Sequence, residues 1–84
     1  MHKGEIWWAN LPSPIGKRPV VLLSRDESYS VRNAVTVAEI TSTIRNIPVE
    51  VHLGTEDGLP KKCVINLGWL KKMQIRTFFR IMLL

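Results

Sequence analysis

Short apolar and β-branched runs, separated by turn residues, are the dominant pattern of this chain. Such runs span residues 6–9, 19–24, 35–41, 49–53 and 63–67. The run at 19–24 is apolar almost throughout, as is typical of a strand covered on both faces. In the run at 49–53, apolar residues alternate with Glu50 and His52. This period of two predicts a strand whose polar side chains lie in water.

The segments between these runs are rich in residues that break strands. Pro12, Ser13 and Pro14 close the first run, and residues 54–60 form a loop by composition. Residues 25–30 are polar, and propensity allows either a turn or one helical turn. Because several short strands follow one another without long helical patterns, we predict a mainly β chain, an antiparallel barrel or sandwich with at most short helices.

The C-terminal residues fit two structures about equally well. Ile75, Phe78, Phe79 and Met82 recur at helical spacing. The pattern of an amphipathic helix is interrupted by Ile81, Leu83 and Leu84. An edge strand fits nearly as well. Either structure leaves apolar surface that needs to be covered.

The length and net charge of the chain indicate how many domains it has and which partners suit it. The 84 residues fit a single domain, residues 1–84. A domain this small buries only about 60–65% of the surface that its unfolded chain exposes, so we expect it to form a homodimer. Lys and Arg number 12 against 7 Asp and Glu, a formal net charge of +5. This excess suits a phosphate-rich partner, although an ordinary basic surface has the same composition.

Several kinds of chemistry lack the residues they need. Cys63 is the only cysteine, so the chain has neither an internal disulfide nor a cysteine-based metal site, and we expect a buried, inert thiol in a reducing compartment. Gly16, Lys17 and Arg18 form too short a segment for a phosphate-binding loop. No metal and no cofactor are therefore predicted. The N-terminus meets charge at once and the apolar C-terminus is shorter than the ~20 residues of a membrane span, so we expect a soluble, cytoplasmic protein.

The two histidines, His2 and His52, stand at no metal-ligand spacing. They would serve as the acid and base of a ribonuclease only if the fold brought them together. Because His2 lies at a terminus expected to fray and His52 on the exposed side of a strand, ordinary surface roles are favoured.

The segment from Pro12 to Ser24 carries the better signal for binding. Its prolines stiffen a loop, and Lys17 and Arg18 stand just before a strand. A guanidinium placed there binds phosphate through two parallel hydrogen bonds at little ordering cost. Two solvated charges at the end of a loop fit the pattern equally well.

A second signal follows the third run. The hydroxyl residues Thr41, Ser42 and Thr43 precede Arg45, and they suit either phosphate contacts or a capped turn, which the pattern alone favours. The tryptophans are similarly open to two interpretations. They can stack on bases, although tryptophan in a small domain more often fills the core or an interface. The tryptophans are Trp7, Trp8 and Trp69.

An ordered set of motifs resembles the MazF/PemK-like toxins. The opening Lys3-Gly4-Glu5-Ile6-Trp7-Trp8 resembles their "rGdiwwv", residues 16–24 resemble "G-x-RPvlvls", and Val37-Ala38-Glu39-Ile40-Thr41 resembles "vapiT". Residues 49–60 resemble "vevplg.edgLp", and residues 64–67 resemble "vvnld". The order and spacing agree from the start of the chain to about Leu70.

The resemblance implies an SH3-like barrel of the CcdB–MazF type, usually dimeric, which cleaves single-stranded RNA, including mRNA, at short sequences without a metal ion. Within it, the family's catalytic arginine falls on Arg18 and its catalytic threonine on Thr41. The candidate RNA-binding residues beside them are Lys17, Ser42, Thr43 and Arg45. Relatives are commonly neutralised by an antitoxin whose acidic C-terminal tail occupies the RNA groove, and such a tail suits a basic surface.

The implied reaction is attack of the RNA 2′-hydroxyl on the adjacent phosphorus, which leaves a 2′,3′-cyclic phosphate and a 5′-hydroxyl end. Arg18 would stabilise the charge that gathers on the phosphoryl oxygens, and Thr41 would orient the phosphate. The motifs assign no group to remove the 2′-hydroxyl proton, because arginine stays charged in proteins.

The chain departs from the family pattern in three places. Its first loop, Pro14 to Lys17, is short; residues 66–73 lack the acidic residue and the threonine of "nLdqirTv"; and the family's C-terminal helix is missing or altered after about residue 70. The alternative function is therefore an impaired or non-enzymatic binder on this fold, either gyrase-poison-like or a nucleic-acid-binding barrel. Convergence of Arg18 and Thr41 on one open basic groove favours the enzyme, and burial of either favours the binder.

Overall fold

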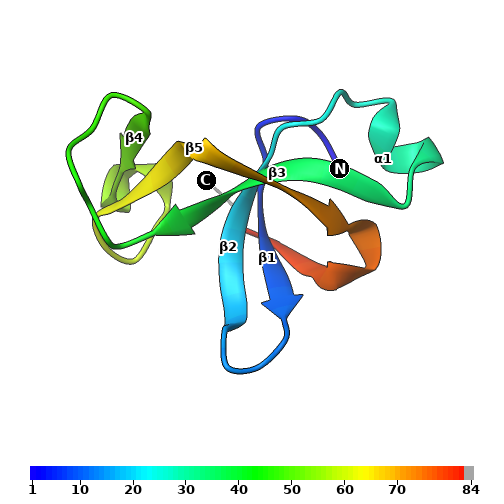
Figure 1. The fold of residues 1–84 in the computed structure, drawn as a ribbon, viewed down its shortest axis with the longest axis horizontal. Coiled ribbons are helices and arrows are strands. Elements are labelled where there is room, and N and C mark those ends of the chain that lie inside the picture. The colour runs from blue at the N-terminus through cyan, green and yellow to red at the C-terminus, as the bar shows by residue number, and fades with distance from the viewer. Residues whose placement is uncertain (83–84) are drawn as a thin grey trace.

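The computed structural model describes residues 1–82, except the side chain of Trp69, and shows one six-stranded antiparallel sheet (Figure 1). The strands are β1 (Ile6–Leu11), β2 (Gly16–Leu22), β3 (Ala34–Thr41), β4 (Glu50–Leu53), β5 (Cys63–Gln74) and β6 (Phe78–Met82). The helical elements are single turns, α1 (Ser28–Val31), η1 (Thr55–Asp57) and η2 (Ile75–Thr77). The predicted mainly β class is confirmed, and the polar segment before residue 31 contains the helical turn.

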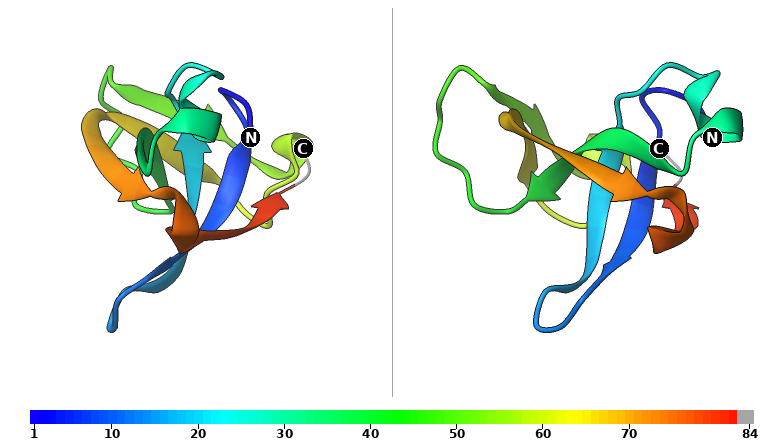
Figure 2. Two further views of the ribbon diagram at one scale, coloured as in Figure 1. Left: turned by 90° about the vertical axis from the view of Figure 1, so that its right-hand side faces the viewer. Right: turned by 45° about the vertical axis from the view of Figure 1, so that its right-hand side comes forward.

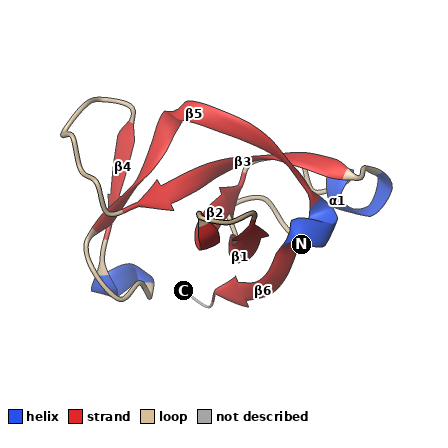
Figure 3. Ribbon diagram, turned by 60° about the horizontal axis from the view of Figure 1, so that its bottom comes forward, coloured by secondary structure: helices blue, strands red, loops and turns tan. Residues whose placement is uncertain are grey.

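The strands lie in the order β4-β5-β3-β2-β1-β6, and the sheet is strongly curled. In Figure 3, β5 and β6 lie on opposite sides of the central hairpin formed by β1 and β2. The far end of this hairpin projects from the rest of the molecule (Figure 2). It turns through Gly16, whose φ of +71° is a conformation that glycine adopts without strain.

Apolar clusters cover both faces of the central strands. Val20 and Leu22 of β2 belong to one cluster, and Val21 between them belongs to the other. Successive side chains of a strand point to opposite faces, so a continuous apolar run fills both clusters at once. The prediction that residues 19–24 are covered on both sides is thereby confirmed for β2.

Strand β5 is longer than the sequence pattern indicated and contains a wide irregularity. Ile40 pairs with Ile65 and Ala38 pairs with Leu70, so residues 66–69 all lie opposite the single residue Glu39. The extra residues bend the strand and change the face that its side chains occupy. One half of β5 therefore pairs with β4, while the other half continues along β3.

Strand β4 departs from the predicted alternation at Glu50, which is buried. Glu50 is only 8% exposed, whereas Val49 and Val51 are 41% and 44% exposed. The Glu50 carboxylate accepts hydrogen bonds from the backbone N–H groups of Arg45 and Asn46 at 2.8–3.1 Å. The prediction that Glu50 lies in water was wrong, because these donors satisfy the charge inside the protein. His52 is exposed, as predicted.

The C-terminal residues form the edge strand rather than the helix. β6 pairs antiparallel with β1, and the pairing shifts register between Trp8 and Ala9. This shift lets Phe78 join one apolar cluster while Met82 packs against the other. Leu83 and Leu84 lie outside the described residues.

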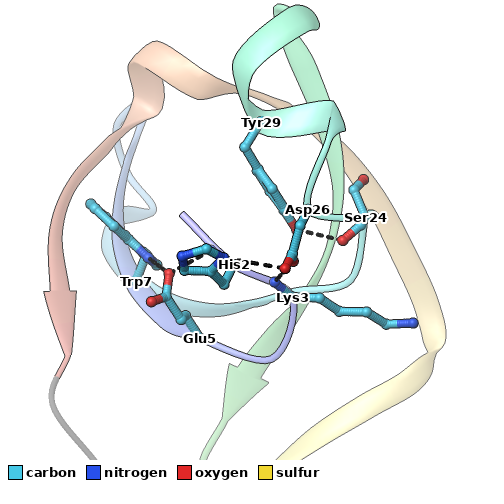
Figure 4. A network of polar contacts seen from close by, with 7 residues as sticks. All are labelled: His2, Lys3, Glu5, Trp7, Ser24, Asp26 and Tyr29. Carbon is cyan, nitrogen blue, oxygen red and sulfur yellow. Dashed lines mark hydrogen bonds and ion pairs between the residues drawn. The ribbon is translucent and has the colours of Figure 1, made fainter.

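The N-terminus is held by four residues that we call the N-terminal clasp: His2, Lys3, Glu5 and Asp26 (Figure 4). Glu5 Oε1 accepts hydrogen bonds from the His2 backbone N–H at 2.7 Å and from the Trp7 indole at 3.1 Å. Asp26 accepts the Lys3 N–H at 2.7 Å and contacts the His2 ring at 3.2 Å. His2 is exposed, but its terminus does not fray as expected, because two carboxylates bind its backbone and ring.

Candidate functional site

The site begins where β2 and β3 separate. Their pairing runs from Leu22 to Val20 and stops there. The Leu22 N–H donates to the carbonyl of Glu5, the residue just before β1. The Leu23 N–H donates to the carbonyl of Thr36 in β3. The alternation therefore directs the backbone nitrogen of Pro19 toward β3, where proline has no hydrogen to donate. The ladder ends at this proline, and the projecting β1–β2 hairpin leaves β3 (Figure 1).

The separation opens a cleft of about 720 Å³. Its lining includes all six residues that the sequence proposed as catalytic or RNA-binding: Lys17, Arg18, Thr41, Ser42, Thr43 and Arg45. The cleft is also lined by Trp8, Pro19, Glu39, Ile40, Leu59, Pro60, Lys61, Cys63, Asn66 and Met82. The structure thus brings residues from β2, from the end of β3 and from the following loop into one place.

Arg18 and Thr41 lie across the cleft from each other. Val20 pairs with Glu39, and continuing this register by two residues sets Arg18 opposite Thr41. The Arg18 side chain is exposed, and its Nη1 donates to the Lys17 carbonyl at 3.3 Å. Thr41 is half-buried, and its Oγ1 accepts the Thr43 N–H at 3.1 Å. Neither residue is buried in the core, which is the arrangement expected of the enzyme rather than the binder.

Two loops form the walls beyond the strands. The loop after β3 is held by Glu50, whose carboxylate accepts hydrogen bonds from the consecutive backbone N–H groups of Arg45 and Asn46. The opposite wall is tied by Asp57, which accepts the Gly54 N–H at 3.0 Å. Leu59 is 4% exposed and anchors this second loop in an apolar cluster. Both walls are therefore fixed to the sheet.

The cleft carries an excess of positive charge. Its cationic lining residues are Lys17, Arg18, Arg45 and Lys61. Among the described lining residues the one carboxylate is Glu39, which is ion-paired with Lys71 of β5. The Lys17 ammonium also lies 5.5 Å from the centre of the Phe79 ring, within cation–π range. A concave surface of this kind attracts anions.

Cys63 lines the cleft and is 6% exposed, as the apolar sequence around it predicted. Burial raises the pKa of its thiol above the ordinary value of 9.0. The thiol therefore stays protonated at neutral pH and is a poor nucleophile.

Sequence reasoning missed several lining residues, above all Glu39, Lys61 and Asn66, and named Trp8 only as one of three tryptophans that could stack on bases. Trp8 and Glu39 stand within the quoted motifs, and their strand positions were the available signal. The loop before β5 brings Lys61 to the cleft, and the bend in β5 brings Asn66 there. Trp7 instead packs against an apolar cluster. The side chain of Trp69 lies outside the described structure.

Other candidate chemistry is not assembled in residues 1–82. Neither His2 nor His52 lines the cleft, and within this range no group of three or more His, Cys, Asp and Glu side chains is placed to hold a metal ion. None of the helices in the same range is long and apolar enough to cross a membrane.

The sequence from residue 2 to residue 81 matches the family model of PemK-like, MazF-like toxins of type II toxin–antitoxin systems. The chain belongs to this family. It is 36% identical over 74 residues to the "Probable endoribonuclease MazF5" of Mycobacterium tuberculosis, covering 87% of this chain and 67% of that protein. It is 37% identical over 81 residues to "Probable endoribonuclease MazF2" of the same species, covering 95% of this chain and 76% of the relative.

Solved structures of MazF toxins share the fold. The M. tuberculosis toxin MazF-mt6 superposes with a TM-score of 0.84 at 28% identity, over 95% of this chain and 78% of that one. The MazE–MazF structure from Deinococcus radiodurans gives a TM-score of 0.78 at 21% identity, over 98% of this chain and 77% of the other. At this lower identity the match concerns the fold alone.

Proposed function

We propose that this MazF-family chain is a toxin that acts as a sequence-specific endoribonuclease on single-stranded RNA and needs no metal ion. The observation that carries the proposal is the placement of Arg18 and Thr41 on opposite sides of one open, cationic cleft. The names of its M. tuberculosis relatives, both probable endoribonucleases, support the same activity.

The proposed reaction is an internal phosphoryl transfer. The 2′-oxygen attacks the neighbouring phosphorus, the bond from phosphorus to the 5′-oxygen breaks, and the products end in a 2′,3′-cyclic phosphate and a 5′-hydroxyl. The Arg18 guanidinium stabilises the negative charge on the phosphoryl oxygens, and the Thr41 hydroxyl orients the phosphate. Because the chain stiffens both sides of the cleft, little ordering is needed when RNA binds.

The remaining candidate residues would hold the neighbouring nucleotides. Lys17 lies beside Arg18 on β2, while Ser42, Thr43 and Arg45 follow Thr41 on the opposite wall. Cations and hydroxyl groups bind successive phosphates without reading the bases, so they give affinity and register. Among the other lining residues, Trp8, Lys61 and Asn66 carry side chains suited to contact bases.

A protein partner would use the same charge. A solved structure similar to this chain contains an endoribonuclease with its cognate antitoxin from a mycobacterial species. We propose that an antitoxin with an acidic C-terminal tail occupies this cleft and blocks RNA, since both ligands are polyanions. The site of action is the cytoplasm, where mRNA is available.

A homodimer is also part of the proposal. Val49, just before β4, and Val51 of β4 are 41% and 44% exposed, and Leu67 is 42% exposed on the neighbouring segment of β5. The Leu67 N–H donates to the Val49 carbonyl, so these side chains lie on adjoining backbone. An apolar group of this kind on a small domain is a natural contact for a second copy.

Cleavage of a long single-stranded RNA in excess chelator tests the function. Wild-type protein should produce fragments with cyclic phosphate and 5′-hydroxyl ends. Arg18→Ala should cleave at least about 10²-fold more slowly, the range found when one donor to a transition-state oxyanion is removed. Arg32→Ala, an exposed arginine after α1, is the matched control and should cleave normally. Intact RNA from folded wild-type protein would move the function to a non-enzymatic binder.

A further inference from the structure

The proposed reaction needs a group that takes the proton from the 2′-hydroxyl, and few residues of the cleft qualify. Lysine and arginine side chains are already protonated at neutral pH. The Cys63 thiol also keeps its proton, because burial raises its pKa. The described lining holds no histidine and one carboxylate, Glu39. A carboxylate is an ordinary general base in enzymes.

Strand geometry places Glu39 with the two proposed catalytic residues. Glu39 and Thr41 are two residues apart on β3, so their side chains leave the same face of the strand. Glu39 pairs with Val20 of β2, and Arg18 is two residues from Val20. Arg18 is therefore the diagonal neighbour of Glu39, a relation in which long side chains still reach each other.

The backbone on either side gives Glu39 an unusual position. On its β2 side it forms the last pair before the strands separate. On its β5 side it faces the four-residue irregularity 66–69. Its side chain is 28% exposed, so it is held by the sheet and still open to the cleft. Lys71 of β5, 48% exposed, forms an ion pair with its Oε2.

Glu39 shares the cleft with several cationic side chains. Lys71 contributes from β5, and the other ionisable groups lining the cleft are Lys17, Arg18, Arg45, Lys61 and Cys63. These charges favour a phosphate close to the carboxylate, which would otherwise repel it.

We propose that Glu39 is the general base of the ribonuclease reaction, an inference that rests on the proposed function. The Glu39 carboxylate accepts the proton as the 2′-oxygen forms its bond to phosphorus, with Arg18 balancing the charge on the phosphoryl oxygens. The bond from phosphorus to the 5′-oxygen breaks, and the departing oxygen takes a proton from solvent water. Glu39 then loses its proton to water, which restores the carboxylate.

The test compares two variants that distinguish the proposed role of Glu39 as a base from its ion pair with Lys71. Glu39→Gln keeps the shape of the side chain but cannot accept a proton, and its cleavage should be about 10²–10⁴-fold slower. Lys71→Gln breaks the same ion pair and leaves the carboxylate, so its cleavage should stay within about tenfold of wild type. Thermal unfolding of both variants shows that they are folded.

Two further readouts distinguish a base from a structural residue. The wild-type rate should rise with pH across the range in which carboxyl groups lose their protons, and Glu39→Gln should lack that rise. Added formate should restore part of the activity of Glu39→Ala, because a small carboxylate enters the space that the truncation leaves. Glu39→Gln should bind RNA at least as tightly as wild type, because it removes a negative charge from the cleft.

Opposite results have separate meanings. Normal cleavage by Glu39→Gln, or equal losses in Glu39→Gln and Lys71→Gln with no formate rescue, would refute the role of Glu39 and leave the ribonuclease intact. If Glu39→Gln does not fold, the formate result on Glu39→Ala and the wild-type pH profile decide. Absence of cleavage by the wild type would remove the proposed function and this inference together.

Discussion

The N-terminal clasp and the cleft are two polar regions of the same small sheet, and they treat their charges in opposite ways. In the clasp, the carboxylates of Glu5 and Asp26 receive backbone and side-chain donors from residues 2, 3 and 7 (Figure 4). In the cleft, four cationic residues surround one carboxylate, which already pairs with Lys71. Carboxylates whose hydrogen bonds are made within the protein stabilise the fold. An excess of positive charge in a cleft is suited to binding an anionic ligand.

Glu50 shows that a carboxylate satisfied within the protein can also lie next to the cleft. It lies beneath a wall of the cleft, yet it resembles the clasp, because its carboxylate is buried and binds two backbone N–H groups. Hydrogen bonds from backbone amides to a carboxylate are charge-assisted and stronger than a solvated surface ion pair. The cleft therefore combines cationic side chains that suit an anionic ligand with a wall that Glu50 holds in place through hydrogen bonds.

Glu50→Ala should give the largest effect among the changes that test this comparison. The substitution leaves the N–H groups of Arg45 and Asn46 without their acceptor. We expect a loss of about 1–3 kcal/mol in the free energy of unfolding. The melting temperature should fall by about 4–8 °C for each kcal/mol in a domain of this size. Cleavage should fall too, because the loop carries the hydroxyl residues of the cleft.

Two variants control this prediction. Glu50→Gln keeps one acceptor oxygen and should lose less stability than the alanine variant. Glu56→Ala removes an exposed glutamate on η1 and should change neither the melting temperature nor cleavage. An equal effect of Glu50→Ala and Glu56→Ala would mean that the buried carboxylate does not support the wall.

The clasp should weaken in acid. The His2 N–H lowers the pKa of Glu5 below its ordinary 4.5, and the Lys3 N–H, with the His2 ring, lowers that of Asp26 below 3.8. A carboxyl whose pKa is lowered by folding stabilises the protein fully above the unfolded value. That stabilisation is lost as the pH falls through the lower, folded pKa. Urea unfolding from pH 7 to pH 2 should show this loss.

Asp26→Asn isolates one half of the clasp. The difference in urea midpoint between wild type and variant should be constant near neutral pH and should shrink below about pH 3.8. Cleavage of RNA by the variant at pH 7 should equal that of wild type, because Asp26 is not part of the cleft. A difference in midpoint that grew in acid would contradict the assigned direction of the pKa.

Lys17→Gln should give the smallest effect, confined to binding. Each phosphate neutralised on single-stranded RNA contributes about 0.7 to the slope of log affinity against log salt. The variant should lose about that much slope and keep its melting temperature. The measurement is a salt titration in an Arg18→Ala background, which keeps the RNA intact. Arg32→Gln, whose arginine lies outside the cleft, should retain the full slope.

Patterns within single strands were enough to predict much of the fold. The unbroken apolar run of β2 requires cover on both faces, and the structure supplies an apolar cluster on each. The alternation in β4 predicted that both of its polar side chains lie in water, which is true of His52, whereas the chain buries Glu50. That burial depends on the donors that Arg45 and Asn46 bring to Glu50, and these come from outside the strand.

The candidate site could be predicted only in part for a similar reason. The local pattern already marked Lys17 with Arg18, and the hydroxyl residues from Thr41 to Thr43, as possible phosphate contacts. The family resemblance added the catalytic roles of Arg18 and Thr41. Glu39 and Lys61 reach the same cleft through strand pairing and through the course of a loop. Register and loop path depend on the whole sheet, so no local pattern expresses them.

Pro19 has a consequence for association that extends beyond the opening of the cleft. From Gly16 to Pro19, β2 is paired with β1 but not with β3, so one side of this segment is a strand edge. Unprotected edges recruit strands from other molecules and lead to aggregation. Here a proline removes a donor, and the charges of Lys17 and Arg18 discourage a second strand from approaching. This strand edge beside the cleft therefore resists backbone pairing with another strand. The side chains of Lys17 and Arg18 stay available to an anionic chain.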